Sequence, residues 1–291
     1  MAPRAAAMRR LALLVAWLVA RCAALEAVEL VAVVLTVPAH RPHRDAIRGG
    51  WGRPSTFDVA VWFVVSSRDA GFGGEPFVAE RAAFGNLVVC DAPAGFDRII
   101  HKVSCAARAA VARFAFDYLL KTDDDATLCL GQVIKDLRAA GPGPLYAGRK
   151  LKARRPLADG KPLRANLGLT HDPPHFGGHG YAVTRDVAAL LAAPDPPRFH
   201  HLHEDTNFGL WMVGLAVKRV NLRAMTDHYY PNAKNVQSVR DPAQVAACEA
   251  LMANRYRANA SWDLHARRRP SLSGARERRR RKKKICAKPL L

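Results

Sequence analysis

Three features that would place a chain in a familiar class are missing from this sequence. None of its six cysteines forms a Cys-x-x-Cys pair, which excludes the ligand spacing of a zinc ribbon. The N-terminal apolar run, residues 11–20, has about half of the roughly 20 residues that a membrane-spanning helix needs. Acidic residues are scarce, with 25 Asp and Glu against 45 Lys and Arg. The resulting net charge of +20 favours polyanionic partners, an anionic membrane face or a bound nucleotide diphosphate.

The positive charge is concentrated near the C-terminus but is not confined to it. Residues 276–284 contain eight basic residues and one acid, so they supply +7 of the total. The tail from residue 267 onward is predicted to be a disordered, solvated charge run. The rest of the chain remains basic, which fits either a polyanion-binding surface or an arginine-rich soluble composition. With 291 residues, 49% of them hydrophobic, the chain can bury one large core or two small ones.

The first 29 residues have the layout of a secretory signal. Arg4, Arg9 and Arg10 precede the apolar run, and the small residues Ala23 and Ala24 follow it. A cleaved signal peptide and a short uncleaved anchor both fit. An ordinary amphipathic first helix fits less well, because the run is apolar on all sides.

Two further features depend on the compartment that the chain enters. Asn259 lies in an Asn-Ala-Ser sequence, a glycosylation acceptor in the secretory pathway. Secretion would also allow one or two disulfides, although the spacing does not pair the cysteines. The cysteines are Cys22, Cys90, Cys105, Cys129, Cys248 and Cys286.

Apolar and helical patterns alternate along the chain. Buried strands are predicted at residues 30–37, 58–66, 86–90, 118–122, 145–148 and 216–220. Helices are predicted at residues 75–84, 102–116, 132–140 and 187–193, with another opening at residue 203. This alternation predicts an α/β fold with a mainly parallel sheet. Residues 149–174 are polar, basic and proline-rich, which is typical of a long functional or mobile loop.

An acidic triplet, Asp123-Asp124-Asp125, follows the predicted strand at residues 118–122. Side chains alternate along an extended chain, so Asp123 and Asp125 should point one way and Asp124 the other. Hard carboxylate ligands suit Mg²⁺ or Mn²⁺, and the carboxyl end of a strand is where ligands collect in open α/β sheets. The pattern therefore indicates a divalent-metal site for a diphosphate. A solvated acidic turn or a helix N-cap is the alternative.

Two other stretches contain candidate site residues. Arg44 and Arg48 are four residues apart, so on a helix they would share a face that could bind phosphate oxygens. The alternative is a solvated helix face. Glu204 and Asp205 would lie in the first turn of a helix, where acids complement the helix dipole or where one could act as a general base.

Two weaker signals lie in the second half of the chain. Gly178 and Gly180 fall in a glycine-rich stretch, which fits either a close approach of the backbone to a ligand or a tight turn. His228 could be a further metal ligand, although a lone histidine usually is not one.

Four stretches, in the right order, resemble motifs of the β-1,3-glycosyltransferase family, which transfers galactose or N-acetylhexosamine from a UDP-sugar. Arg44–Gly52 resembles the family's R-x-A-I-R-x-[ST]-W-G, and Lys121–Asp125 resembles K-x-D-D-D. Gly178–Thr184 resembles G-x-G-Y-V-[IL]-S, and Glu204–Gly209 resembles E-D-V-x-x-G. One such motif is weak, but four ordered motifs across about residues 30–230 are specific.

The resemblance implies a GT-A fold, with a single mainly parallel central sheet flanked by helices. It also implies a Golgi or endoplasmic reticulum enzyme that depends on Mn²⁺ and inverts the anomeric carbon. Asp205 would be the catalytic base, with Glu204 the second candidate. Carried over by position, Asp123 and Asp125 would contact the ribose and the metal, with Asp125 the surest metal ligand, and His228 stays the further candidate given above. The implied donor-binding residues are Arg44, Arg48, Lys102, Asp123, Asp124, Gly178 and Gly180.

The chain departs from the family pattern at four places. Gly50 replaces the usual Ser or Thr, and Thr206 replaces Val. Phe176 stands where the family has a cysteine, so that family disulfide is expected to be absent. Little chain is left for a stem between Arg21 and Leu30, which bears on the membrane anchor rather than on the chemistry.

The predicted organisation has four parts. Residues 1–29 form a signal peptide or short signal anchor, and 30–235 form the GT-A catalytic domain. Residues 236–266 extend that domain, and 267–291 form the basic tail.

The expected function is transfer of a hexose or N-acetylhexosamine, galactose first of all, in a β-1,3 linkage to a glycan acceptor on protein or lipid. The Golgi membrane would be a partner, in type II orientation, if the N-terminal segment is uncleaved. Two other classes stay open: a different metal-dependent nucleotide-using transferase, and a non-catalytic basic nucleic-acid-binding protein. The N-terminal signal argues against the last, so no nucleic acid partner is expected.

Overall fold

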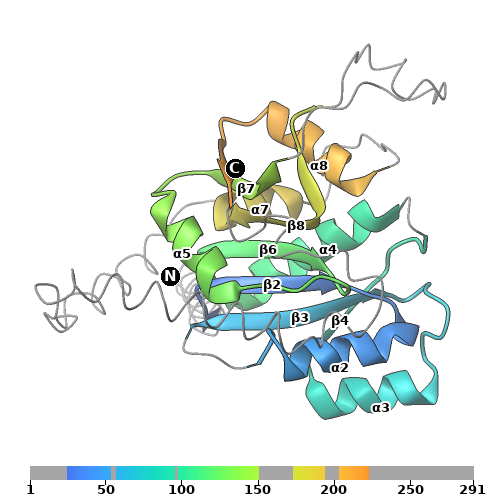
Figure 1. Cartoon of the computed structure of the whole chain (residues 1–291). Coiled ribbons are helices and arrows are strands. Elements are labelled where there is room, and N and C mark those ends of the chain that lie inside the picture. Colours follow the sequence, from blue (N-terminus) through green and yellow to red (C-terminus); the bar gives the residue numbers. More distant parts are fainter. Residues whose placement is uncertain (1–24, 54–56, 96–97, 151–172, 194–202, 223–291) are drawn as a thin grey trace, which may run out of the picture.

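The structure is a computed structural model, and it describes residues 25–53, 57–95, 98–150, 173–193 and 203–222 (Figure 1). Most of the predicted N-terminal signal lies outside these ranges, as do His228, Asn259 and the basic tail. No helix among the described residues combines the length and the apolar character needed to cross a membrane.

The described part of the chain is built around a seven-stranded sheet with the order β4-β3-β2-β6-β8-β7-β9 (Figure 1). Its strands are β2 (Leu30–Leu35), β3 (Val59–Ser66), β4 (Leu87–Cys90), β6 (Tyr118–Asp123), β7 (Leu145–Lys150), β8 (Phe176–Thr184) and β9 (Lys218–Asn221). Neighbouring strands are parallel except that β8 runs antiparallel to both β6 and β7. The predicted α/β class with a mainly parallel central sheet is confirmed.

The described part of the chain contains a short strand before residue 30, the predicted first residue of the catalytic domain. Strand β1 (Glu26–Ala27) pairs in parallel with β5 (Phe114–Ala115), next to the main sheet. Arg113 and Glu26 form an ion pair at 3.8 Å beside this small sheet. The residues just before Leu30 therefore belong to the folded unit rather than to the N-terminal segment that the sequence predicts up to residue 29.

Helices cover both faces of the sheet. They are the short 3-10 helix η1 (Pro38–His40), α2 (Arg41–Gly49), α3 (Glu75–Phe84), α4 (Ile99–Arg113), α5 (Leu130–Ala139), α7 (Arg185–Leu191) and α8 (Glu204–Val213). Helix α3 has the predicted bounds. Helix α4 ends at Arg113 instead of residue 116, because the next two residues pair with β1.

Strand β2 lies in the middle of the core because its side chains are apolar on both faces. Val31 and Val33 pack with α4, α7 and α8, whereas Leu30 and Ala32 pack with α5 on the other face. Val34 packs in a third cluster with α2 and α3. All of these strand residues are fully buried. The continuous apolar run is thus the signature of a central strand covered on both sides.

One disulfide joins the end of β4 to α4. Cys90 and Cys105 are bonded at 2.11 Å and are 15 residues apart in the sequence. The bridge secures α4 against the edge of the sheet that β4 forms.

Candidate active site

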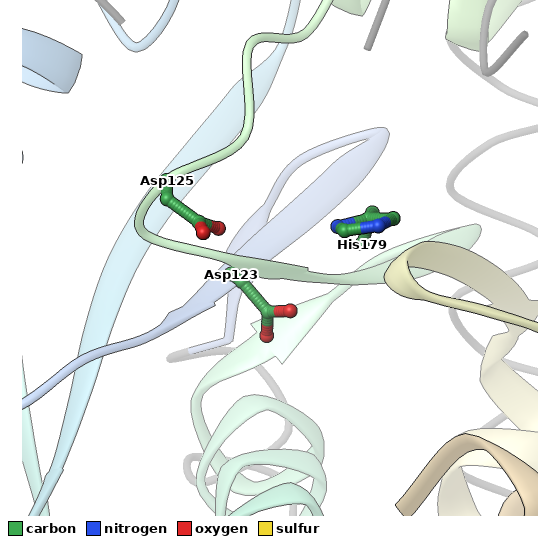
Figure 2. Close-up of side chains that lie close together, drawn as sticks. All are labelled: Asp123, Asp125 and His179. Atoms are coloured by element: carbon green, nitrogen blue, oxygen red, sulfur yellow. The ribbon is translucent and has the colours of Figure 1, made fainter. Parts of the chain in front are cut away.

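The acidic triplet lies at the carboxyl end of β6, the end of a strand at which ligands bind in open α/β sheets. Asp123 is the last residue of that strand and is in register with Leu35, the last residue of β2. The predicted alternation is confirmed: Asp123 and Asp125 gather with His179 of β8, whereas Asp124 forms its contacts elsewhere (Figure 2). The neighbouring strands β6 and β8 therefore bring His179 to two acids that are more than 50 positions before it in the sequence.

The grouped side chains have the donor set of a divalent-metal site. One ligand atom from each of Asp123, Asp125 and His179 lies within 4.8 Å of the others. Burial raises the pKa of Asp125, and the neighbouring carboxylates of Asp123 and Asp124 raise it further. A divalent cation would relieve this repulsion, and carboxylate oxygens are ligands that Mg²⁺ and Mn²⁺ accept. The residues present therefore fit such an ion.

Lys121 connects the acidic triplet to α8. Its buried ammonium contacts Asp123 Oδ1 at 2.8 Å and Glu204 Oε2 at 3.1 Å. It also donates a hydrogen bond of 2.5 Å to the carbonyl oxygen of Gly178. Burial by itself would lower the pKa of Lys121, but the carboxylates of Asp123 and Glu204 outweigh that effect and raise it. The lysine therefore stays charged and holds both acids at one place.

Glu204 and Asp205 begin α8, as predicted, but they have different surroundings. Glu204 is held by Lys121 and by the hydroxyl of Tyr181, which donates a short hydrogen bond to Glu204 Oε1. Burial raises the pKa of Glu204, although the Lys121 ammonium opposes the shift. The side chain of Glu204 is 7% exposed and that of Asp205 is 21% exposed. Asp205 is therefore the carboxylate that a substrate can reach more easily.

The backbone around Asp205 orients its carboxylate. Asp205 Oδ2 accepts a hydrogen bond from the Gly178 amide at 3.2 Å, and Oδ1 accepts one from the Thr206 amide at 2.8 Å. His175 lies on the same side, with Nε2 4.0 Å from Asp205 Oδ2. The Nδ1 atom of this buried histidine is 2.8 Å from the Pro173 carbonyl oxygen, so Nδ1 is the nitrogen that donates.

Asp124, predicted to bind the donor, contacts the chain that follows β2. Its Oδ2 accepts a hydrogen bond of 2.5 Å from Thr36 Oγ1 and lies 2.9 Å from His40 Nδ1. The side chain is buried against the segment that follows β2. Donor binding by Asp124 stays a prediction, and strand alternation turns this side chain away from the other two acids. It instead ties the end of β6 to the turn after β2.

The arginines predicted to bind phosphate, Arg44 and Arg48, both lie on α2. Both pair with a carboxylate of the protein itself, that of Glu80. Arg44 is fully buried and forms a two-pronged pair with Glu80 of α3, at 2.8 and 2.7 Å. Arg48 contacts Glu80 at 2.8 Å and Asp45 at 2.8 Å. Arg48 also stacks on the ring of Phe84 at 4.0 Å. A buried carboxylate therefore pairs with both guanidinium groups, and donor binding by Arg44 and Arg48 stays a prediction.

Lys102 and the glycine residues lie close to strand ends. The buried Lys102 ammonium is 2.6 Å from Asp69 Oδ2 and 3.2 Å from the Thr36 carbonyl oxygen, at the end of β2. Gly178 binds Lys121 and Asp205 through its backbone, and Gly180 is in register with Thr122. The glycines lie within β8 rather than in a turn before it. Donor contacts by Lys102, Gly178 and Gly180 stay predictions.

Sequence reasoning missed three residues of this site as site residues. Lys121 had a usable signal, because a lysine two positions before Asp123 in a buried strand must be paired with an acid. The sequence signal for Tyr181 and His179 was weaker. Only the antiparallel pairing of β8 with β6 shows which side chains of the two strands meet. His228, predicted as a metal ligand, lies outside the described residues.

Comparison with known proteins gives an independent result. A family model described as Galactosyltransferase matches residues 42–223, more than half of the chain. A hydroxyproline O-galactosyltransferase of Arabidopsis thaliana is 25% identical over 200 residues, which are 64% of this chain and 29% of that protein. Beta-1,3-galactosyltransferase 6 of Mus musculus is 28% identical over 203 residues, which are 65% of this chain and 62% of the relative. The chain thus spans less than two thirds of the length of both relatives.

The comparison with solved structures includes glucosyl-3-phosphoglycerate synthase from Mycobacterium tuberculosis, in complex with Mg²⁺ and uridine diphosphate. The two align with a TM-score of 0.39 and 15% sequence identity, over 67% of this chain and 69% of that chain.

Proposed function

The chain belongs to the galactosyltransferase family, and from this premise we propose that it transfers a hexose, in the first place galactose, from a UDP-sugar to a hydroxyl group of a glycan acceptor. The observation that carries the proposal is the contact of one buried ammonium, that of Lys121, with Asp123 and Glu204 at once. This contact places the acidic triplet beside the Glu-Asp pair of α8. The contact supports the proposal, because the proposed diphosphate site and the proposed catalytic carboxylate are then neighbours.

Asp123 and Asp125 would hold a divalent cation, which we propose is Mn²⁺. When bound, such an ion neutralises the negative charge of the diphosphate and makes UDP a better leaving group. Lys121 keeps the Asp123 carboxylate in place, because its ammonium contacts Asp123 Oδ1 at 2.8 Å. The +20 charge of the chain suits this anionic donor.

Asp205 is the proposed general base. Its carboxylate removes the proton from the acceptor hydroxyl, and the acceptor oxygen forms a bond to the anomeric carbon. The bond between that carbon and the diphosphate oxygen breaks on the opposite face, so the configuration inverts and UDP leaves with the electron pair. The hydrogen bond from the Gly178 amide to Asp205 Oδ2 orients the carboxylate for this step. Glu204, locked by Lys121 and Tyr181, supports the site instead of serving as base.

We also propose a β-1,3 linkage and an acceptor on protein or lipid in the secretory pathway. The Cys90–Cys105 disulfide supports this location, because disulfides persist in oxidising compartments. The Golgi lumen or membrane is the proposed site of action. The catalytic unit would comprise roughly residues 26–235, followed by its extension and the basic tail.

A UDP-release screen over several UDP-sugars, with Mn²⁺ and a panel of glycan acceptors, tests the proposal. We expect release of UDP that depends on both the sugar donor and the acceptor. Asp205→Asn keeps the size of the side chain but cannot accept the proton, so transfer should fall by about 10²- to 10⁴-fold with Mn²⁺–UDP affinity nearly unchanged. Asp125→Ala should lose affinity and transfer together. Thermal unfolding of each variant checks that the fold is intact.

Different failures of this experiment have different meanings. If Glu204→Gln abolishes transfer and Asp205→Asn does not, the base is the neighbouring acid. If both variants transfer at the wild-type rate, the pair only caps α8 and the mechanism is wrong. Turnover of nucleoside triphosphates without sugar transfer would instead indicate a nucleotidyltransferase.

A further inference from the structure

We propose that His179 is a third, nitrogen-donating ligand of the metal site and that it makes the site select Mn²⁺ over Mg²⁺. This inference rests on the proposed function, because it concerns the ion that would serve the UDP-sugar. It adds a residue outside the acidic triplet and a reason for the identity of the metal.

The sheet register places His179 opposite Asp123. Lys121 is paired with Tyr181, and Thr122 with Gly180, in the antiparallel ladder of β6 and β8. One step further along the same register sets Asp123 opposite His179. Directly opposed residues of such a ladder project to the same face, with Cβ atoms about 4.5–5.5 Å apart. The meeting of these side chains therefore follows from the backbone pairing and not only from their rotamers.

Local contacts hold the backbone of His179 at this point. Thr122 Oγ1 donates a hydrogen bond of 2.7 Å to the carbonyl oxygen of His179. Gly177, Gly178 and Gly180 surround it in the sequence. The imidazole is thus the only side chain beyond hydrogen between residues 177 and 180, and Figure 2 shows it near Asp123 and Asp125.

The separation of the three groups is close to that of ligands on one ion. Their ligand atoms lie within 4.8 Å of one another. Two ligands on opposite sides of a Mg²⁺-sized ion lie about 4.2 Å apart, twice the metal–oxygen distance. His179 is exposed, so a small rotation of its ring can close a difference of about half an ångström without disturbing the core.

The imidazole decides which metal fits. Mg²⁺ prefers oxygen ligands and gives up water reluctantly, whereas first-row transition metals accept imidazole nitrogen. A site of two carboxylates alone would bind Mg²⁺ and Mn²⁺ with little discrimination. Adding His179 should raise the affinity for Mn²⁺ more than the affinity for Mg²⁺.

Pulsed electron paramagnetic resonance of Mn²⁺ bound to the full chain in the presence of UDP tests the ligand directly. An imidazole ligand produces a ¹⁴N coupling that carboxylate oxygens cannot produce. We expect this coupling in the wild type and its loss in His179→Gln. The matched control is His101→Gln, on α4, whose histidine belongs to no metal-binding group in the described part of the chain. That variant should keep the coupling.

Calorimetric titration with Mn²⁺ and with Mg²⁺ gives the second readout. Loss of an outer partner of a metal ligand typically costs about 10- to 100-fold in affinity. Loss of a direct ligand should therefore lower the Mn²⁺ affinity of His179→Gln at least about tenfold, with a smaller change for Mg²⁺. Thermal unfolding should be near that of the wild type, since the side chain is exposed.

Three outcomes would overturn the inference. The first is wild-type protein that binds Mn²⁺ without a ¹⁴N coupling, or that does not bind Mn²⁺ at all. The second is a coupling that survives in His179→Gln and vanishes in His228→Gln, which would assign the nitrogen to the other histidine. The third is an equal loss of Mn²⁺ and Mg²⁺ affinity. None of these measurements requires sugar transfer, so the inference can fail while the proposed function stands, and the reverse.

Discussion

Arg44 has no exposed surface, yet it carries a full positive charge into the core. It is stable there because Glu80 of α3 accepts both prongs of its guanidinium, while the carbonyl oxygens of Val37 and Pro38 accept further hydrogen bonds. Lys102 with Asp69 and Lys121 with Asp123 follow the same rule. These three buried cations are paired, since an unpaired buried charge would cost several kcal/mol.

Glu80 should make stability depend on pH. Burial alone would raise the pKa of Glu80, but hydrogen bonds and charges from Arg44 and Arg48 outweigh it and hold the pKa below its ordinary value of 4.5. A lowered pKa in the folded state stabilises the protein above the unfolded value, and this stabilisation is lost as the pH falls through the folded value. Glu80→Gln should therefore lower the free energy of unfolding at pH 7 by about 3–5 kcal/mol, because it leaves buried cations unpaired.

Urea unfolding of Glu80→Gln and wild type between pH 7 and pH 3 measures this effect. The difference between them should shrink below the ordinary pKa of 4.5. Asp45→Asn is the matched control, because Asp45 also pairs with arginines, Arg41 and Arg48, but its side chain is 37% exposed. It should change stability by about 1 kcal/mol at most. A pH-independent difference for Glu80→Gln would contradict the assigned role of the carboxylate.

Gly209 allows helix α8 to pack closely against the chain at Pro174 and His175. A Cβ atom on Gly209 would lie 2.4 Å from the Cβ of His175 and 2.9 Å from the Pro174 carbonyl oxygen. The helix therefore approaches the chain just before β8 so closely that only glycine fits. This contact holds the N-terminal turn of α8, and with it Asp205, against the site.

Gly209→Ala should displace α8. The added Cβ would collide with the backbone of Pro174 and His175, which cannot turn aside as the end of a flexible side chain can. Overpacking of this kind costs about 1–3 kcal/mol, and a shift of the helix should also reduce transfer. Gly178→Ala is the control for stability, since its Cβ would meet nothing closer than 3.8 Å, which is ordinary contact. Thermal unfolding of both variants distinguishes them. Equal stability of Gly209→Ala and wild type would show that α8 is not seated by this contact.

At the scale of the whole molecule, the sheet edge at β4 and the face formed by α4 are held together covalently. The Cys90–Cys105 bridge closes a loop between residues 15 positions apart. Helix α4 also carries Lys102, whose ammonium reaches the end of β2. The bridge therefore stabilises the same end of the sheet at which the candidate site lies.

Replacing both cysteines, Cys90→Ser with Cys105→Ser, should lower the free energy of unfolding by about 3 kcal/mol, the value expected for a loop of about 15 residues. Chemical denaturation measures the loss, and peptide mapping without reductant should recover Cys90 and Cys105 in one linked pair. If the two peptides run separately in protein from the secretory pathway, the bridge does not form there.

Much of the fold and the site could be predicted from the sequence by itself. Apolar runs and helical spacing determined the strands, the helices and the α/β class, because burial acts on each element through its own periodicity. Strand alternation separated Asp124 from Asp123 and Asp125. Four ordered motifs determined the family and placed Asp205 at the start of a helix.

Only the tertiary structure decided which distant groups meet. It paired Arg44 and Arg48 with Glu80, joined Cys90 to Cys105 and brought His179 close to Asp123 and Asp125. Periodicity shows which side of an element is polar but not which element lies across from it, because that depends on strand order, register and helix packing. The arginines looked like phosphate ligands for this reason. Their shared partner, Glu80, lies on α3, 36 residues from Arg44, and only packing brings it to them.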